Sequence, residues 1–512
     1  MKGCFYLQRN FAYIGHTMAL LLKERYGFTK FCGYVSVRPG YEFLKGQKDI
    51  VYTKLVLEED IIARHKTEQI DYQYLAYLER EYGIPNLWPY IMSDRVIRYN
   101  LFLRAYPSDA SAYSHEDMMK ILQVSARAVI AFLEEEKPNF IVFSVTNNLS
   151  SLLLYHIAKK KGITTIVFGS PRIGIRYLLS ERYDRSTFLE AAFREMRKEA
   201  KQERKPYYAQ AKRFLMEFQG KPQYFLAASG GAATILGNLK VNRFRYFVFF
   251  SPARFFRSAG WIMRSFREYL LNTRKDDYII IKPWNELRDK ITRRLRVLRG
   301  YADLYDEPVA GESYGYFALH TEPEGDPMVL APFYLDQIWL AKQIARSLPL
   351  SFKLYVKDHP VMVGLRPRSY YEELRKIPNV RLINPARSGL ALIEGSQLTL
   401  TITGTSGFEA VLLKKPVILF GAMYYDILSS VKRCAAITDL PVFVKEQVEQ
   451  FTYNEPELLD FLAAAYAESV PVELIQLWDI EGGKEFRKNR ERLEGLVNLL
   501  AEKLFSGHTH YE

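Results

Sequence analysis

Residues 352–421 constrain the fold most, because apolar strand-like runs alternate there with helical segments and end in polar or glycine residues. The runs FKLYV (352–356), LTLTIT (398–403) and PVILFG (416–421) each have the length of one buried strand. Strands that alternate with helices predict a parallel sheet, which binds ligands at the carboxyl ends of its strands. We therefore expect an α/β domain with a ligand site along that edge.

A glycine-rich turn lies between the last two runs and precedes a helical segment. It comprises Thr403, Gly404, Thr405, Ser406 and Gly407. Small residues let a backbone approach a ligand, while free N–H groups and the helix dipole favour an anion. The turn thus predicts a phosphate site, and the alternative is that Thr405 or Ser406 only caps the helix.

A second polar cluster follows the first run, where Lys357 and Asp358 precede His359 and Pro360. Proline stops the strand and fixes the loop, so that an ammonium and an imidazole are held at the strand end. A His-Pro pair alone also fits an ordinary loop. Two such clusters within one alternating run favour a nucleotide pocket.

Longer segments around both clusters, VKDHPVMVGLRPRSYYEELRKIPNVRLINP, TGTSGFEA and KKPVILFG, resemble the capsule polysaccharide biosynthesis proteins. These are GT-B-type glycosyltransferases that include the bacterial Kdo transferases. Looser similarities lie at 77–95, 157–176 and 316–328. The resemblance implies two Rossmann-like domains that face a cleft, with a nucleotide sugar held mainly by the C-terminal domain.

The resemblance also implies roles for individual residues. His359 and Pro360 match a His-Pro motif that contacts the nucleotide phosphate, and residues 403–406 match a Ser/Thr-rich phosphate turn. Glu409 would accept hydrogen bonds from a ribose, or it is a solvated helix residue. The expected nucleotide-binding residues are Lys357, His359, Pro360, Thr403, Gly404, Thr405, Ser406, Gly407 and Glu409.

The expected catalytic residues are His320, Glu322 and Glu324, which follow the strand-like run YFALH. Glycosyl transfer needs a carboxylate or an imidazole near the reacting centre, and Pro323 would hold the two glutamates apart. The alternative is a polar interdomain linker. Kdo-transferase relatives carry a glutamine-containing segment near this position, whereas this chain has HTEPE (320–324). Because this segment is expected to face the cleft, the donor sugar, CMP- or UDP-linked, and the retaining or inverting outcome stay open.

The first half of the chain contains a strand-helix-strand pattern, in which TTIVFG (164–169) is followed by Arg172 and Arg176. Arginines just past a strand end suit an anionic acceptor or a donor carboxylate, or they are surface arginines.

At 512 residues and 48% hydrophobic, the chain can bury two sizeable cores. We predict an α/β, GT-B-like fold of two Rossmann-like domains with a basic aromatic helical insertion. The predicted parts are an acceptor-side domain at 1–325 with the insertion at about 225–310, a nucleotide-sugar domain at 326–480, and a helix at 481–512 that crosses back to the first domain.

Most of the excess positive charge, +13 overall, lies in 241–300, which has 15 Lys and Arg against 5 Asp and Glu. Aromatic residues are interleaved there, which suits an anionic membrane surface. The alternatives are plain helical packing and, less favoured, nucleic-acid binding. We expect peripheral membrane contact through 243–300 and no nucleic-acid partner.

No run reaches the roughly 18 apolar residues that span a bilayer, and a signal-peptide core is not apparent. We therefore expect a cytoplasmic protein at the inner face of the cell membrane.

The three cysteines form no CxxC pair, and no Asp-x-Asp signal follows a convincing buried strand. Neither a disulfide framework nor a metal site is therefore predicted. The sequence favours a metal-independent glycosyltransferase without a cofactor, whose partners are a nucleotide sugar and a glycan or glycolipid acceptor. Two other classes stay open, namely a sugar-nucleotide epimerase or glycerophosphotransferase on the same scaffold, and a non-catalytic scaffold of a polysaccharide assembly complex.

Overall fold

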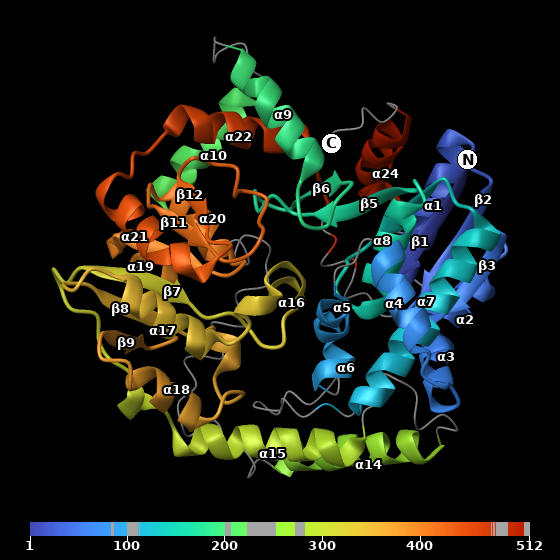
Figure 1. The fold of residues 1–512 in the computed structure, drawn as a ribbon, viewed down its shortest axis with the longest axis horizontal. Helices are drawn as coiled ribbons and strands as arrows, with labels where there is room; N and C mark the ends of the chain where they lie inside the picture. The colour runs from blue at the N-terminus through green and yellow to red at the C-terminus, as the bar shows by residue number, and fades with distance from the viewer. Residues whose placement is uncertain are drawn as a thin grey trace.

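The computed structural model describes residues 1–82, 86–99, 111, 113–199, 206–222, 252–271, 282–472, 474, 477 and 490–505. These residues form two α/β domains, each built on one twisted sheet (Figure 1). The predicted fold class of two Rossmann-like domains is thereby confirmed.

The first domain is built on a seven-stranded sheet in the order β13-β6-β5-β4-β1-β2-β3. Strands β1 to β5 pair in parallel, whereas β6 is antiparallel to β5, and β13 is antiparallel to β6. The strands are β1 (Lys2–Leu7), β2 (Lys30–Val35), β3 (Tyr52–Leu57), β4 (Phe140–Phe143), β5 (Thr164–Gly169), β6 (Arg176–Ser180) and β13 (Ser469–Pro471).

Helices cover both faces of this sheet, because its parallel strands are apolar on both sides. α1 and α24 share one buried cluster with β1 and β2, and α7 and α8 share the opposite cluster. α7 begins with a capping box between Ser114 and Asp117, and α8 begins with one between Asn148 and Ser151. The helices are α1 (Phe11–Tyr26), α2 (Arg38–Lys45), α3 (Glu58–Ala63), α4 (Tyr72–Glu81), α5 (Trp88–Ser93), α6 (Arg95–Tyr99), α7 (His115–Glu136), α8 (Leu149–Lys160) and α24 (Arg490–Phe505).

The second domain is built on a six-stranded, fully parallel sheet in the order β12-β11-β10-β7-β8-β9. One face is covered by α17, α18 and α21, and the other by α19, α20 and α22. The strands are β7 (Tyr314–Ala318), β8 (Lys353–Lys357), β9 (Val380–Ile383), β10 (Leu398–Thr401), β11 (Val417–Leu419) and β12 (Val431–Arg433). The helices are α16 (Gly325–Leu330), α17 (Gln337–Ser347), α18 (Arg368–Arg375), α19 (Gly389–Gly395), α20 (Thr405–Leu412), α21 (Leu440–Glu449) and α22 (Glu455–Ala467).

The predicted domain boundary at residue 325 needs correction. β7 pairs with β10 and β8 in the middle of the second sheet, so the second domain begins before residue 314. α9 (Thr187–Lys198) and α10 (Tyr208–Gly220) also pack on the second domain, against α22. In return, β13 joins the first sheet from far down the chain. The chain therefore crosses between the domains more often than a single boundary allows.

The predicted helical insertion contains α14 (Pro252–Leu271) and α15 (Pro283–Arg299), which run along one edge of the molecule in Figure 1. The C-terminal half of α15 is fixed to the second domain, where the Arg296 guanidinium donates to the Leu365 carbonyl. Residues 223–251 and 272–281 of the predicted insertion lie outside the described residues.

Candidate functional site

A cavity of about 490 Å³ lies at the carboxyl edge of the second sheet. Because β10, β7 and β8 are neighbours, the loops that follow them meet there. Most of the predicted site residues line this cavity. They are Arg172, His320, Glu324, Lys357, His359, Pro360, Thr403, Gly404, Thr405, Ser406 and Glu409.

The glycine-rich turn places unpaired hydrogen-bond donors at the start of α20. Among the described residues, the backbone N–H groups of Thr405 and Ser406 have no partner. The hydroxyls of Thr403 and Ser406 are buried and also lack one. A Cβ on Gly404 would lie 2.4 Å from the Thr401 hydroxyl oxygen, so the turn requires glycine there. An anion fits these donors, and the positive end of the helix dipole favours it.

Lys357 and His359 lie at the end of β8, as predicted from the sequence. Burial lowers the pKa of Lys357 to about 8. Burial and then the charge of Lys357 lower the pKa of His359 to about 4, so that its imidazole is neutral near pH 7. The His359 Nδ1 accepts the Val361 N–H at 3.3 Å, which leaves the proton on Nε2 as a donor.

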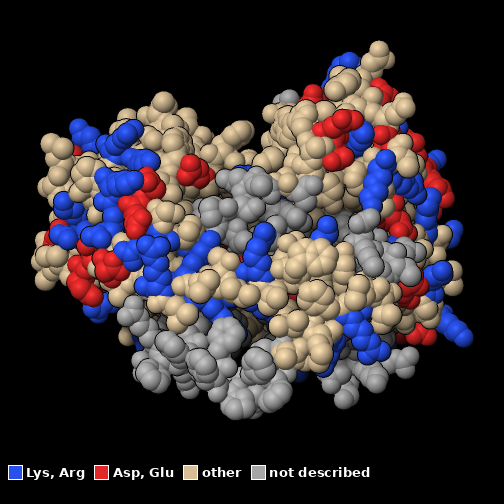
Figure 2. All heavy atoms as spheres, turned by 90° about the horizontal axis from the view of Figure 1, so that it is seen from below, with Lys and Arg blue, Asp and Glu red and all other residues tan. Residues whose placement is uncertain are grey.

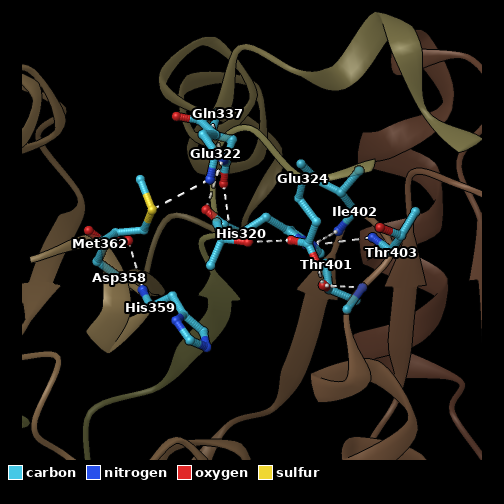
Figure 3. A network of polar contacts seen from close by, with 12 residues as sticks. His320, Glu322, Glu324, Gln337, Asp358, His359, Met362, Thr401, Ile402 and Thr403 are labelled. Carbon is cyan, nitrogen blue, oxygen red and sulfur yellow. Dashed lines mark hydrogen bonds and ion pairs between the residues drawn. The ribbon is translucent and has the colours of Figure 1, made fainter. Parts of the chain in front are cut away.

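His320 organises the turn rather than acting as a free base. Its Nε2 accepts the backbone N–H groups of Ile402 and Thr403 at 3.2 and 3.3 Å (Figure 3). Nε2 is therefore unprotonated, and in the neutral ring the proton is on Nδ1. Nδ1 lies 3.6 Å from the Glu324 Oε2 atom. His320 thus links the end of β10 to Glu324.

Glu324 is a carboxylate of the cavity. Its Oε2 accepts the Thr321 hydroxyl at 2.8 Å. Burial acts to raise the pKa of Glu324, but the hydrogen bond and charge of His320 and the Thr321 hydroxyl outweigh it and hold this pKa below its usual value. Glu324 is therefore ionised near pH 7.

Glu322 does not line the cavity, which corrects its predicted catalytic role. Its side chain turns toward α17, where Gln337 donates to it at 2.6 Å (Figure 3). The Arg366 Nη2 atom lies 3.2 Å from the Glu322 carboxylate. Arg366 is fully buried, and it also donates to Asp358 and to the His320 carbonyl. Glu322 and Arg366 therefore form an internal brace beneath the site, and Arg366 does not point to a ligand.

Glu409 lies on α20 and is almost fully buried at the wall of the cavity. Burial raises its pKa to about 7, and the charges of Lys357 and Arg172 act in the opposite direction. The alternative, a solvated helix position, is thus not what the structure shows. A carboxyl group in this state can accept or donate a hydrogen bond near pH 7.

Arg172 lines the cavity, whereas Arg176 does not. Arg176 donates to Ser469 and to the Tyr466 carbonyl and stacks on the Tyr466 ring, so it joins β6 to the end of α22 instead of binding a substrate. Gly407 is likewise structural, because a Cβ there would lie 2.2 Å from the Tyr425 hydroxyl oxygen.

Two features of the cavity were not predicted from the sequence. One is Asp326, at the start of α16, whose carboxylate makes no hydrogen bond or ion pair with the described residues. The other is the loop after β9, residues 385–389. Each follows the carboxyl end of a strand, which is the signal that could have identified them.

The fold and the cavity define a two-domain α/β protein with a candidate anion site at the edge of its second sheet. The family model "Capsule polysaccharide biosynthesis protein" matches residues 338–430, from α17 to the residue before β12. Residues 338–430 are thus similar to this family, in agreement with the resemblance seen in the sequence. No protein of curated function matches the chain at a significant level.

Comparison with solved structures gives only distant similarities. The chain is 12% identical to the β-Kdo 2,7 transferase of Thermosulfurimonas dismutans KpsC, with 78% of this chain and 95% of that chain covered and a TM-score of 0.31. The chain is also 12% identical to UDP-GlcNAc 2-epimerase from Neisseria meningitidis, with 99% of this chain and 100% of that chain covered and a TM-score of 0.23. Scores this low carry no argument about activity.

Proposed function

We propose that the protein is a glycosyltransferase that moves a sugar from a CMP- or UDP-linked donor to a glycan or glycolipid acceptor of surface polysaccharide biosynthesis. The observation that carries the proposal is the set of unpaired donors at α20, namely two N–H groups and the buried Thr403 hydroxyl. The family match covers the same segment. Its description supplies the polysaccharide context.

In this proposal the donor phosphate lies against the start of α20, with Lys357 and the His359 Nε2–H on its other side. Transfer breaks the bond between the anomeric carbon and a phosphate oxygen, and the nucleotide keeps the electron pair. Fixed N–H donors and an ammonium stabilise the charge that develops on this leaving group. Glu409, one turn into the helix, would hydrogen-bond the ribose.

Nucleotide binding to the full chain tests the donor site. A panel of CMP, UDP, GDP and CDP should contain one nucleotide that raises the melting temperature, since a ligand at 100 times its Kd stabilises by about 2.7 kcal/mol. Thr403→Val should lower the affinity for that nucleotide about 10- to 150-fold. This range corresponds to the loss of one hydrogen bond to a charged group, which contributes about 1.5–3 kcal/mol.

Lys376→Ala is the control, because Lys376 is an exposed lysine of the same domain that pairs with Glu373 and does not line the cavity. It should leave nucleotide affinity unchanged. No stabilisation by any nucleotide would contradict the proposal and favour a non-catalytic scaffold.

Product analysis separates the enzyme classes that stay open. An epimerase converts a sugar nucleotide without an acceptor, whereas a glycosyltransferase consumes the donor only when an acceptor is present. A glycerophosphotransferase would instead require a glycerol-linked nucleotide. We propose metal-independent transfer, so activity should survive EDTA, and a strict magnesium requirement would contradict this part of the proposal.

We also propose that the protein acts at the inner face of the cell membrane and docks through α14 and α15. No helix of the described residues has the length and the apolar character needed to cross a bilayer. On α15, Trp284, Ile291, Leu295 and Leu298 are exposed at spacings of seven, four and three, which places them on one face. In Figure 2, which views this edge of the molecule, blue Lys and Arg atoms spread over the middle while red atoms gather toward the sides. Apolar side chains among cations suit an anionic lipid surface.

Co-sedimentation with phosphatidylglycerol vesicles at several salt concentrations tests the docking surface. Binding should weaken with salt and be reduced by Leu295→Glu. Leu350→Glu is the matched control, because Leu350 is an even more exposed leucine that lies on the second domain outside α14 and α15. Binding that is absent or insensitive to salt would remove the membrane proposal.

A further inference from the structure

A second cavity, of about 470 Å³, lies between the two domains. Its walls come from residues 144–145 after β4, from the end of β5 and the loop after it, from β6, and from residues 422–424 of the second domain. α16 closes it on one side, and Figure 1 shows that helix between the domains. Both cavities have the size of a small-molecule site.

The two cavities meet at a pair of residues. Arg172 and Asp326 line both of them, and they are the shared residues of the two linings. Arg172 follows β5 of the first domain, while Asp326 lies at the start of α16 of the second. A group that extends from one cavity into the other therefore passes next to these two side chains.

The lining of the second cavity suits a sugar ring. Phe168, Tyr177, Tyr183 and Tyr424 are half-buried, so that part of each ring remains exposed there. Aromatic side chains offer an apolar face, which matches the C–H face of a pyranose, and tyrosines add a hydroxyl for its polar edge. The Arg182 guanidinium at the rim donates to both Asp184 oxygens, which holds the loop that carries Tyr183.

We infer that the second cavity binds the non-reducing end of the acceptor glycan and that Asp326 takes the proton of its attacking hydroxyl, an inference that rests on the proposed glycosyltransferase function. The hydroxyl oxygen forms a bond to the anomeric carbon, the bond from that carbon to the phosphate oxygen breaks, and the nucleotide leaves with the electron pair. The hydroxyl proton passes to the Asp326 carboxylate. Among the described residues, Asp326 is the one carboxylate that lines both cavities.

Asp326 suits this role better than Glu324 for two reasons. Glu324 lines only the donor cavity, and its Oε2 is already hydrogen-bonded to Thr321 and faces His320. The Asp326 carboxylate has no such partner among the described residues. In addition, its position inside the cleft, away from bulk water, and the charge of Glu324 raise the pKa of Asp326, which makes its carboxylate a stronger base, although Arg172 acts against this shift.

A glycan array probed with the full chain and a saturating nucleotide tests the acceptor cavity without knowledge of the donor sugar. The wild type should bind a defined set of glycans, Tyr183→Ala should lose them, and Asp326→Asn should keep them. If the wild type binds a nucleotide but no glycan, or if Tyr183→Ala binds like the wild type, the acceptor assignment is overturned and the proposed donor site still stands.

Turnover with a CMP- or UDP-linked sugar and a bound glycan tests Asp326. Asp326→Asn should lower kcat about 100- to 10,000-fold, the range of general-base catalysis, with nucleotide affinity and acceptor KM changed only a few-fold. Asp439→Asn, an exposed aspartate of the same domain, should keep wild-type kcat. An Asp326→Asn variant that retains more than about a tenth of wild-type kcat would overturn the assignment.

Discussion

Replacing Arg366 by methionine should destabilise the second domain, because this arginine is the centre of the brace beneath the candidate site. Arg366 and Asp358 both have 0% exposure, and the guanidinium also donates to the His320 carbonyl at 2.7 Å. Tyr371 donates to the other Asp358 oxygen at 2.5 Å. Methionine fills much of the same volume but leaves Asp358 buried without its cation.

The size of the effect follows from this burial. Removing one partner of a buried ion pair costs about 3–5 kcal/mol, since an uncompensated charge remains in the interior. For a domain of about 150–250 residues, each kcal/mol lowers the melting temperature by about 2–4 °C, so the loss should be about 6–20 °C. Burial already raises the pKa of Asp358, and removing Arg366 would raise it further. A folded-state pKa above the unfolded value lowers stability as the pH rises, so the loss should be smaller at about pH 5 than at about pH 8.

Differential scanning calorimetry of the full chain at both pH values measures this effect. Arg368→Met is the matched control, because Arg368 pairs with Asp303 and Glu372 on the surface two residues away, and it should change the melting temperature far less. Adding Asp358→Asn to Arg366→Met should recover part of the stability. Equal losses for the two arginine variants, or no recovery in the double variant, would refute the reasoning.

Three further outcomes are expected. Nucleotide affinity should fall by up to about tenfold per pH unit above about pH 8, where Lys357 loses its proton, and Lys357→Met should weaken binding and remove most of that dependence in a calorimetric titration. Glu58→Gln should raise the melting temperature more at about pH 8.5 than at about pH 6. Burial raises the pKa of Glu58 in the folded protein to about 8, so the wild type loses stability as the pH rises through that value, and glutamine removes this loss. Gly404→Ala should weaken nucleotide binding while keeping far-UV circular dichroism, because the new Cβ displaces Thr401 and Ser406, and unchanged affinity would count against the turn as the phosphate site.

The local part of the candidate site could be predicted from the sequence because it follows single strand ends. The predicted strands at 352–356, 398–403 and 416–421 correspond to β8, β10 and β11. The polar residues after the first two lie in one cavity, since parallel neighbours end at the same edge. Such features depend on composition and spacing within a few residues.

Features that depend on distant pairing could not be predicted in the same way. Glu322 and Glu324 are indistinguishable in sequence, and the difference arises from Arg366, which lies more than 40 residues on and braces only Glu322. Arg176 donates a hydrogen bond to Ser469, almost 300 residues away, because β13 returns to the first sheet. The domain boundary was misplaced for the same reason, since the central place of β7 depends on β10 and β8, which follow it.

The central place of β7 also explains why one short segment after it touches every part of the proposed reaction. His320 holds the phosphate turn, Glu324 faces the donor cavity, and Asp326 lies where the two cavities meet. Between the last two, Gly325 packs against Asn147 of the first domain, and a Cβ there would lie 2.8 Å from the Asn147 side-chain nitrogen. A side chain at this position would require Asn147 to shift, so glycine suits the close contact between the domains here. His320 contacts the glycine-rich turn, and a few residues of backbone join it to Gly325, which contacts the first domain. Residues 320–326 thus connect the glycine-rich turn, the two cavities and the contact with the first domain.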